Sequence, residues 1–143
     1  FRLFLFLVPC LTLAQYPKTM ILANLLGKID SVAVIHRTGW TKETSWAGAP
    51  EEERITEERW RLPLSKGKRL LKILQDKTVY KEEYPLLNDV VSSFLFYANG
   101  NEVLTIHFSM ETKQLTMYKG DELIFAGMSK GSLTQSLIRY LKQ

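Results

Sequence analysis

Cysteine and histidine are scarce in this chain, which contains one cysteine and two histidines among 143 residues. A zinc site needs at least three protein ligands, and neither His36 nor His107 has a carboxylate or further histidine at metal-binding spacing. The single cysteine, Cys10, has no partner for a disulfide bond within the chain. The composition therefore predicts no metal and no other cofactor.

Short motifs that mark common enzyme sites are also absent. The sequence has no GxGxxG, GxxxxGK[ST], HExxH or GxSxG pattern, and these patterns bind phosphates, hold zinc or present a serine nucleophile. The carboxylate runs at residues 51–53 and 57–58 fall on segments expected to be extended, where neighbouring side chains point alternately apart. They do not form a pair for acid–base catalysis. We therefore predict no catalytic residue, and an enzyme is the less favoured hypothesis.

The charge balance does not indicate a nucleic-acid-binding protein. The formal net charge is +4, and lysines and arginines alternate with glutamates in most of the chain. A nucleic-acid interface instead gathers positive charge on one face. The densest cationic group is Lys66, Lys68, Arg69 and Lys72, which could bind an anion, but a solvated helix face is the favoured interpretation.

The longest apolar run covers residues 1–14, FRLFLFLVPCLTLA. It is shorter than the ~20 residues of a membrane span and fits a secretory signal peptide. Thr12 and Ala14 place small residues at the −3 and −1 positions of a cleavage site. Two alternatives are lipidation at Cys10, where Pro9 departs from a lipobox, and retention of the run as an anchor. We predict an exported protein (periplasmic, cell-envelope or secreted) with no membrane span once the signal is removed.

The clearest structural pattern is a β-hairpin centred on Asn99-Gly100. This dipeptide tolerates the positive φ angles of a type I′ turn, and apolar runs with strand periodicity flank it. Such a hairpin must bury its apolar face, so the neighbouring segments are expected to cover or extend it. The apolar face collects six side chains: Phe94, Phe96, Ala98, Leu104, Ile106 and Phe108.

The remaining segments carry helix or strand patterns. Helices are expected over residues 17–29, 65–76 and from Ser129 or Ser132 to Leu141. Strands are expected over residues 31–40, 54–62, 91–98, 101–108, 114–118 and 122–126. Residues 77–89 have mixed composition and are expected to connect a helix to the hairpin. Residues 15–143 thus predict a single α+β domain. Its mostly antiparallel sheet has about six strands with helices on one face, in the order α-β-β-α-β-β-β-β-α.

The same patterns predict three details of the helices. Met20 is expected in the buried apolar stripe of the first helix. Ser65 is expected to cap the second helix, and either Ser129 or Ser132 to cap the third.

Several short patterns lie together between about Leu62 and the C-terminus. They are Leu64-Ser65 before a helix with Leu70-Leu71 and Leu74, the run DKTVY at residues 76–80, and a meander through Phe94, Leu104-Thr105-Ile106 and Tyr118. In these patterns the chain resembles an uncharacterised type of small exported bacterial α+β domain. Members usually carry a signal peptide or lipobox, and several have cysteines near where this chain has Ser92, Ser93 and Ser109. The resemblance implies export and an α+β fold, and it implies no activity.

The favoured function is an exported, non-enzymatic binding module whose partner is a protein, a peptide or a component of the cell envelope. Its candidate surface is the sheet face away from the helices, where aromatic and hydroxyl side chains gather. The candidate residues are Leu95, Tyr97, Thr105, His107, Thr116 and Tyr118. The alternative is a small hydrolase or small-molecule-binding protein with a pocket between sheet and helix. A solvent-connected pocket of roughly a few hundred Å³ lined by His36 or His107 would favour that alternative.

Overall fold

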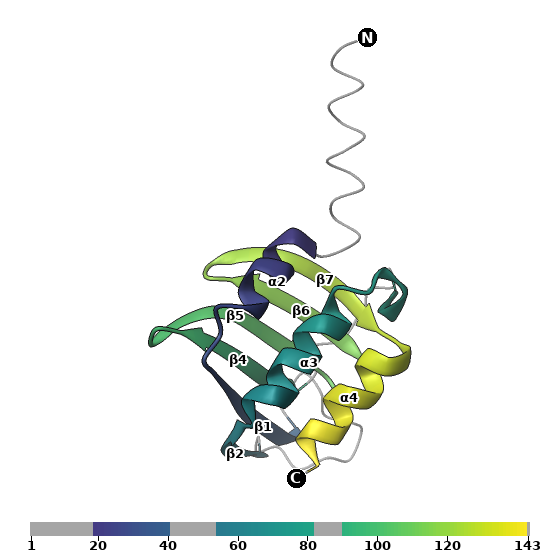
Figure 1. The fold of residues 1–143 in the computed structure, drawn as a ribbon. Helices are drawn as coiled ribbons and strands as arrows, with labels where there is room; N and C mark the ends of the chain where they lie inside the picture. Colours follow the sequence, from purple (N-terminus) through teal and green to yellow (C-terminus); the bar gives the residue numbers. More distant parts are fainter. Residues whose placement is uncertain (1–18, 41–53, 82–89, 143) are drawn as a thin grey trace.

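The computed structural model describes residues 19–40, 54–81 and 90–142. The predicted signal peptide of residues 1–14, with Cys10, lies outside these ranges, as do residues 82–89 of the predicted connector. The described residues form one antiparallel sheet with helices on one of its faces (Figure 1). The predicted α+β class is confirmed.

Three α-helices and one short 3-10 helix occur in the described ranges. They are α2 (Thr19–Leu26), α3 (Leu64–Leu74), η1 (Lys77–Val79) and α4 (Gly131–Leu141). Figure 1 shows the three α-helices side by side over the same face of the sheet, with α3 in the middle. None of the helices in the described ranges is long and apolar enough to cross a membrane.

The sheet has seven strands in the order β2-β1-β4-β5-β6-β7-β3, and every neighbouring pair is antiparallel. The strands are β1 (Ser31–Trp40), β2 (Arg54–Leu62), β3 (Tyr80–Lys81), β4 (Ser92–Ala98), β5 (Asn101–Phe108), β6 (Gln114–Lys119) and β7 (Glu122–Ser129). The strand β2, which is rich in charged residues, lies at one edge, where charge discourages pairing with another chain.

The predicted hairpin lies in the middle of this sheet as β4 and β5. Asn99 and Gly100 both have positive φ, 53° and 78°, as a type I′ turn requires. Phe94 pairs with Ile106 and Phe96 with Leu104, so their side chains share a face. The Asp30 carboxylate accepts a 2.8 Å hydrogen bond from the Asn99 amide and ties this turn to the start of β1.

The core lies between this face and the helices. Apolar side chains of the central strands and of all three α-helices are fully or almost fully buried there. From the sheet these are Val32, Val34, Phe94, Phe96, Leu104, Ile106, Phe108, Leu115 and Met117. From the helices they are Leu22, Leu25, Leu70, Leu71, Leu74, Leu133, Leu137, Tyr140 and Leu141.

The connector and the start of the last helix differ from the prediction. Tyr80 and Lys81 form a seventh strand, because Tyr80 pairs with Ser129 at the end of β7. Consequently β7 runs on to Ser129, and α4 begins only at Gly131 with no side-chain cap from a serine. A two-residue strand depends on a partner distant in sequence, so it has no local periodicity.

Two further helix details were predicted wrongly. Met20 is 74% exposed, because it precedes the buried Leu22 by two residues and so lies on the opposite side of the helix. Ser65 does not cap α3, whose N-cap position is taken by Pro63. Ser65 is therefore the second residue of the helix, two positions after the N-cap. A side-chain hydroxyl caps a helix from the N-cap position.

Candidate ligand-binding site on the far face of the sheet

Strand alternation places all six predicted binding residues on the face opposite α2, α3 and α4, which we call the far face. Leu95 pairs with Thr105 and Thr105 with Tyr118, while His107 pairs with Thr116. Side chains of directly paired residues share a face, and the intervening residues of these strands point into the core. Thr105 is almost fully buried, and the other five side chains are partly buried.

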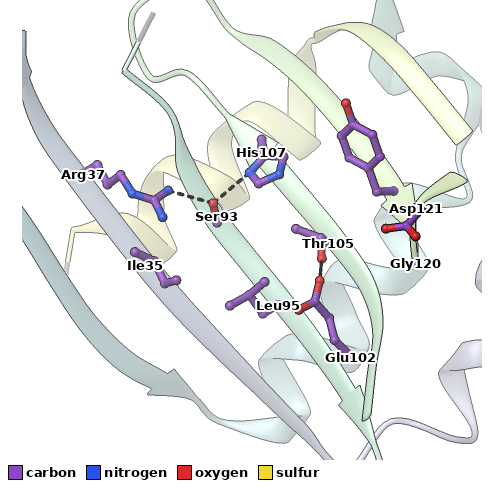
Figure 2. Close-up of a pocket in the computed structure, with 10 residues that line it drawn as sticks. Ile35, Arg37, Ser93, Leu95, Glu102, Thr105, His107, Gly120 and Asp121 are labelled. Atoms are coloured by element: carbon purple, nitrogen blue, oxygen red, sulfur yellow. Dashed lines mark hydrogen bonds between the residues drawn. The ribbon is translucent and has the colours of Figure 1, made fainter. Parts of the chain in front are cut away.

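Four of these six residues line a hollow of about 390 Å³ on the far face (Figure 2). Tyr97 and Thr116 are not part of its lining. The hollow extends over β1, β4, β5 and β6 and reaches the turn before β7. Its lining residues are Ile35, Arg37, Ser93, Leu95, Glu102, Thr105, His107, Tyr118, Gly120 and Asp121.

A hydrogen-bond network centred on Ser93 organises one end of the hollow. Ser93 Oγ lies 2.8 Å from His107 Nδ1 and 2.9 Å from Arg37 Nη1 (Figure 2). A guanidinium group only donates, so Ser93 Oγ accepts from Arg37. The hydroxyl hydrogen of Ser93 is then free to donate to His107 Nδ1, so that Nδ1 acts as the acceptor. A neutral His107 then carries its ring proton on Nε2.

Arg37 is held in place by hydrogen bonds to three residues, one of which is Ser93. Its Nε donates to Glu57 Oε1 on β2 at 3.1 Å, and its Nη1 also donates to the carbonyl oxygen of Val91 at 3.2 Å. Hydrogen bonds from Arg59 and from Arg37 keep the pKa of Glu57 below its ordinary value. Glu57 therefore stays charged and keeps the guanidinium group of Arg37 in position.

His107 is neutral at physiological pH in this environment. Burial lowers the pKa of His107, the nearby Arg37 guanidinium lowers it further, and Glu102 partly opposes both effects. The ring also meets the Tyr118 ring edge to face, with centroids 5.9 Å apart. His107 is thus a fixed, uncharged hydrogen-bonding group in the wall of the hollow.

The opposite end of the hollow carries negative charge. Glu102 stands at the start of β5 and accepts a hydrogen bond from the Thr105 hydroxyl (Figure 2). Asp121 follows Gly120 in the turn between β6 and β7, and both carboxylates are exposed. Along β4, the residue paired with His107 is Ser93 and the residue paired with Glu102 is Tyr97. These two backbone positions are four residue steps apart, or ~13 Å at ~3.3 Å per residue, and the Glu102 carboxylate reaches back toward His107 as far as Thr105.

The second histidine lies elsewhere. His36 points to the helix side of the sheet, where its Nδ1 lies 2.9 Å from Ser92 Oγ and its ring meets Trp60 at 6.1 Å between centroids. The strands β1 and β5 are separated by β4, so the two histidines do not form a common site.

A second hollow lies on the helix side of the sheet, between α2 and the ends of β5 and β6. Its volume is about 460 Å³. It is lined by Ile21, Asn24, Leu25, Lys28, Glu102, Val103, Lys119 and Gly120. Its position between helix and sheet matches the pocket expected for a small-molecule-binding protein, but neither histidine lines it. The hollow on the far face has the volume and the His107 lining expected for that alternative, but it lies on the face of the sheet away from the helices.

Ser93 and His107 resemble a nucleophile and its base in residue type and in their 2.8 Å contact, but their surroundings do not suit nucleophilic catalysis. Ser93 is 1% exposed, and its oxygen already accepts from Arg37. The strand around it pairs with β1 and β5 on both sides, so its main-chain amides are committed to the sheet and unsuited to holding an oxyanion. No group of three or more His, Cys, Asp or Glu residues that could hold a metal ion occurs within residues 19–40, 54–81 and 90–142.

The residues predicted from sequence include four that line the hollow and omit Ser93 and Glu102 on the same strands. Ile35 and Arg37 belong to it because β1 lies beside β4, and no local pattern reveals that neighbour. Comparisons with protein-family models, curated proteins and solved structures find no match to this chain. The resemblance to exported bacterial domains therefore stays a prediction.

Proposed function

We propose that this protein is a non-enzymatic binding module that holds a peptide segment of its partner in the hollow on the far face. The observation that carries the proposal is the hollow itself. Four residues chosen by strand alternation line it together with a fixed Arg37–Ser93–His107 network. Its volume of about 390 Å³ falls in the range of small-ligand sites, which combine an apolar lining with a few placed polar groups.

The chemistry of the lining fits a peptide better than a purely apolar or purely charged ligand. Ile35 and Leu95 provide an apolar floor, and Thr105 and Tyr118 add hydroxyl groups. Arg37 and the two carboxylates lie at different ends. A peptide offers apolar side chains, backbone hydrogen-bonding groups and charges within one extended molecule.

Export belongs to the same proposal. Its support is the apolar run of residues 1–14, whose length and small residues at positions 12 and 14 fit a signal peptide. The partner would accordingly be a peptide or protein met outside the cytoplasm or in the cell envelope.

A library experiment tests the proposal. The protein is immobilised and exposed to synthetic random hexapeptides, and the retained peptides are identified by mass spectrometry and resynthesised. Backbone amide shifts of the protein are then followed during titration with each peptide. We expect the largest shifts at Ser93, Leu95, Thr105 and His107.

Two substitutions sharpen this experiment. His107→Ala should weaken binding by about 0.5–1.5 kcal/mol, the contribution of one hydrogen bond, whereas a catalytic base would mainly change turnover. Lys72→Ala on the exposed side of α3 is the matched control and should leave binding unchanged. Failure to retain any peptide, or shifts confined to the helix side, would overturn the proposal.

The second hollow supports a different candidate, a small-molecule site between α2 and the sheet. Apolar side chains of Ile21, Leu25 and Val103 line it together with Lys28 and Lys119. If this hollow is the functional one, ligand-induced shifts should centre on Val103 and Leu25 and be unaffected by His107→Ala.

A further inference from the structure

We propose that the hollow on the far face recognises both charged ends of a short extended peptide. The C-terminal carboxylate would lie at the Arg37–His107 end and the N-terminal ammonium group at the Glu102–Asp121 end. This inference rests on the proposed function and specifies its ligand.

The cationic end has hydrogen-bond donors to spare. Arg37 uses Nε and Nη1 for Glu57, Val91 and Ser93, and its Nη2 donates to no residue in the described ranges. The side chain of Arg37 is 28% exposed and lines the hollow. His107, bonded at Nδ1 by Ser93, presents an Nε2 hydrogen as a second donor. A carboxylate accepts several hydrogen bonds, and those from guanidinium groups are among the strongest.

The anionic end has acceptors to spare. Thr105 donates to Oε1 of Glu102, and the other oxygen of this carboxylate accepts from no residue in the described part of the chain. Asp121 lies close by in the lining of the same hollow. An ammonium group has three donors and no acceptor, so it complements a pair of carboxylates.

The spacing of the two ends fits a short peptide of about two to four residues. The backbone positions of His107 and Glu102 are four residue steps of β4 apart, ~13 Å. The Glu102 carboxylate reaches back to Thr105, whose β4 partner Leu95 is two steps, ~7 Å, from Ser93, and extended peptides of these lengths span the ends. Ile35 and Leu95 lie between the ends, where they can contact apolar side chains in the middle of the peptide. A simple anion or cation would satisfy only one end.

The test uses the tetrapeptide Ala-Leu-Leu-Ala in four forms: free, N-acetylated, C-amidated and blocked at both ends. Binding of each form is followed by the amide shifts of Leu95, Thr105 and His107. Removing one charge-assisted contact should weaken binding about tenfold or more. The free form should therefore bind most tightly, and the doubly blocked form least.

Variants of the protein test which end of the hollow binds each charged end of the peptide. In Arg37→Gln the advantage of the free form over the amidated form should shrink to the contribution of His107, while binding remains sensitive to acetylation. Asp121→Asn combined with Glu102→Gln should show the opposite pattern. Both of these residues are exposed, and glutamine keeps a side-chain oxygen that can accept from Thr105. Lys72→Gln serves as the control and should reproduce the parent protein.

Two outcomes would overturn the inference. Equal binding of all four forms would show that the peptide ends are not recognised, although the proposed function would stand. The inference would also fall if none of the four forms bound while hexapeptides from the library did. Retention of no library peptide would overturn the proposed function itself, so the two failures are distinguishable.

Discussion

At the scale of single residues, the Ser92–Ser93 pair organises both faces of the sheet. Consecutive residues of a strand point to opposite faces, so Ser92 meets His36 on the helix side and Ser93 meets His107 on the far face. Ser92 Oγ also accepts from the backbone amide of Arg37 at 3.1 Å. Two small hydroxyl side chains thereby fasten β4 to β1 and β5 and position the groups of the hollow.

The environment of His107 makes stability depend on pH in a defined direction. Burial and Arg37 hold the pKa of His107 in the folded protein below its ordinary value, near 6.5 in an unfolded chain. Below about pH 6.5 the unfolded chain therefore binds a proton more readily than the folded one. We expect the free energy of unfolding to fall as the pH decreases from about 6.5 through the lower, folded-state pKa.

Urea unfolding of the parent protein and of His107→Gln, from about pH 7.5 to about pH 5, measures this effect. The difference in free energy between the two proteins should narrow as the pH falls, because the variant lacks the titrating group. The carboxylates with lowered pKa, Glu57 and Asp76, lose stabilisation only at lower pH. A difference that is constant over the whole range would contradict the environment described for His107.

At the scale of elements, the sequence predicts what depends on neighbouring residues and misses what depends on distant ones. The Asn99-Gly100 hairpin and the strand of residues 31–40 are confirmed as β4–β5 and β1, because turn chemistry and side-chain periodicity are local. Strand β3 was missed because Tyr80 becomes extended by pairing with Ser129, far along the chain. For the same reason Arg37 could not be assigned to the hollow from sequence.

Truncation of the hairpin core tests which face is buried. Phe96 and Ile106 are both 0% exposed, so changing either to alanine should decrease the free energy of unfolding by about 2–5 kcal/mol. Leu123→Ala is the control, since Leu123 is 50% exposed, and its effect should be small. Thermal and urea unfolding curves that superimpose on those of the parent would mean that the face assignment is wrong.

The contact of α3 with β1 depends on a glycine. A Cβ atom at Gly67 would lie 2.4 Å from Cγ2 of Val32, so Gly67→Ala forces the helix and the strand apart. We expect a loss of about 1–3 kcal/mol, although alanine favours a helix. The double variant Gly67→Ala/Val32→Ala removes the clashing methyl group and should therefore recover part of the lost free energy of unfolding.

Gly27→Ala is the matched control for this prediction, because nothing lies within 4 Å of a Cβ atom there. It should leave the midpoint of urea unfolding nearly unchanged. An equally small effect of Gly67→Ala would show that α3 does not approach β1 as closely as described.

At the scale of the whole molecule, the two faces of the sheet carry different groups of side chains. One face carries the core beneath α2, α3 and α4 (Figure 1). The far face carries a hollow that combines apolar, hydroxyl and charged groups from four strands and a turn (Figure 2). Because the hollow spans the central strands, its geometry is fixed by the same strand pairing that builds the core, which would preorganise it for the ligand we propose.

The most direct test of the account is an intermolecular NOE measurement on the protein bound to a retained library peptide. Methyl groups report on each hollow separately, since Ile35 and Leu95 line the hollow on the far face and Val103 lines the hollow beside α2. The account predicts cross-peaks from the peptide to the methyl groups of Ile35 and Leu95 and none to Val103. Cross-peaks to Val103 alone would contradict it.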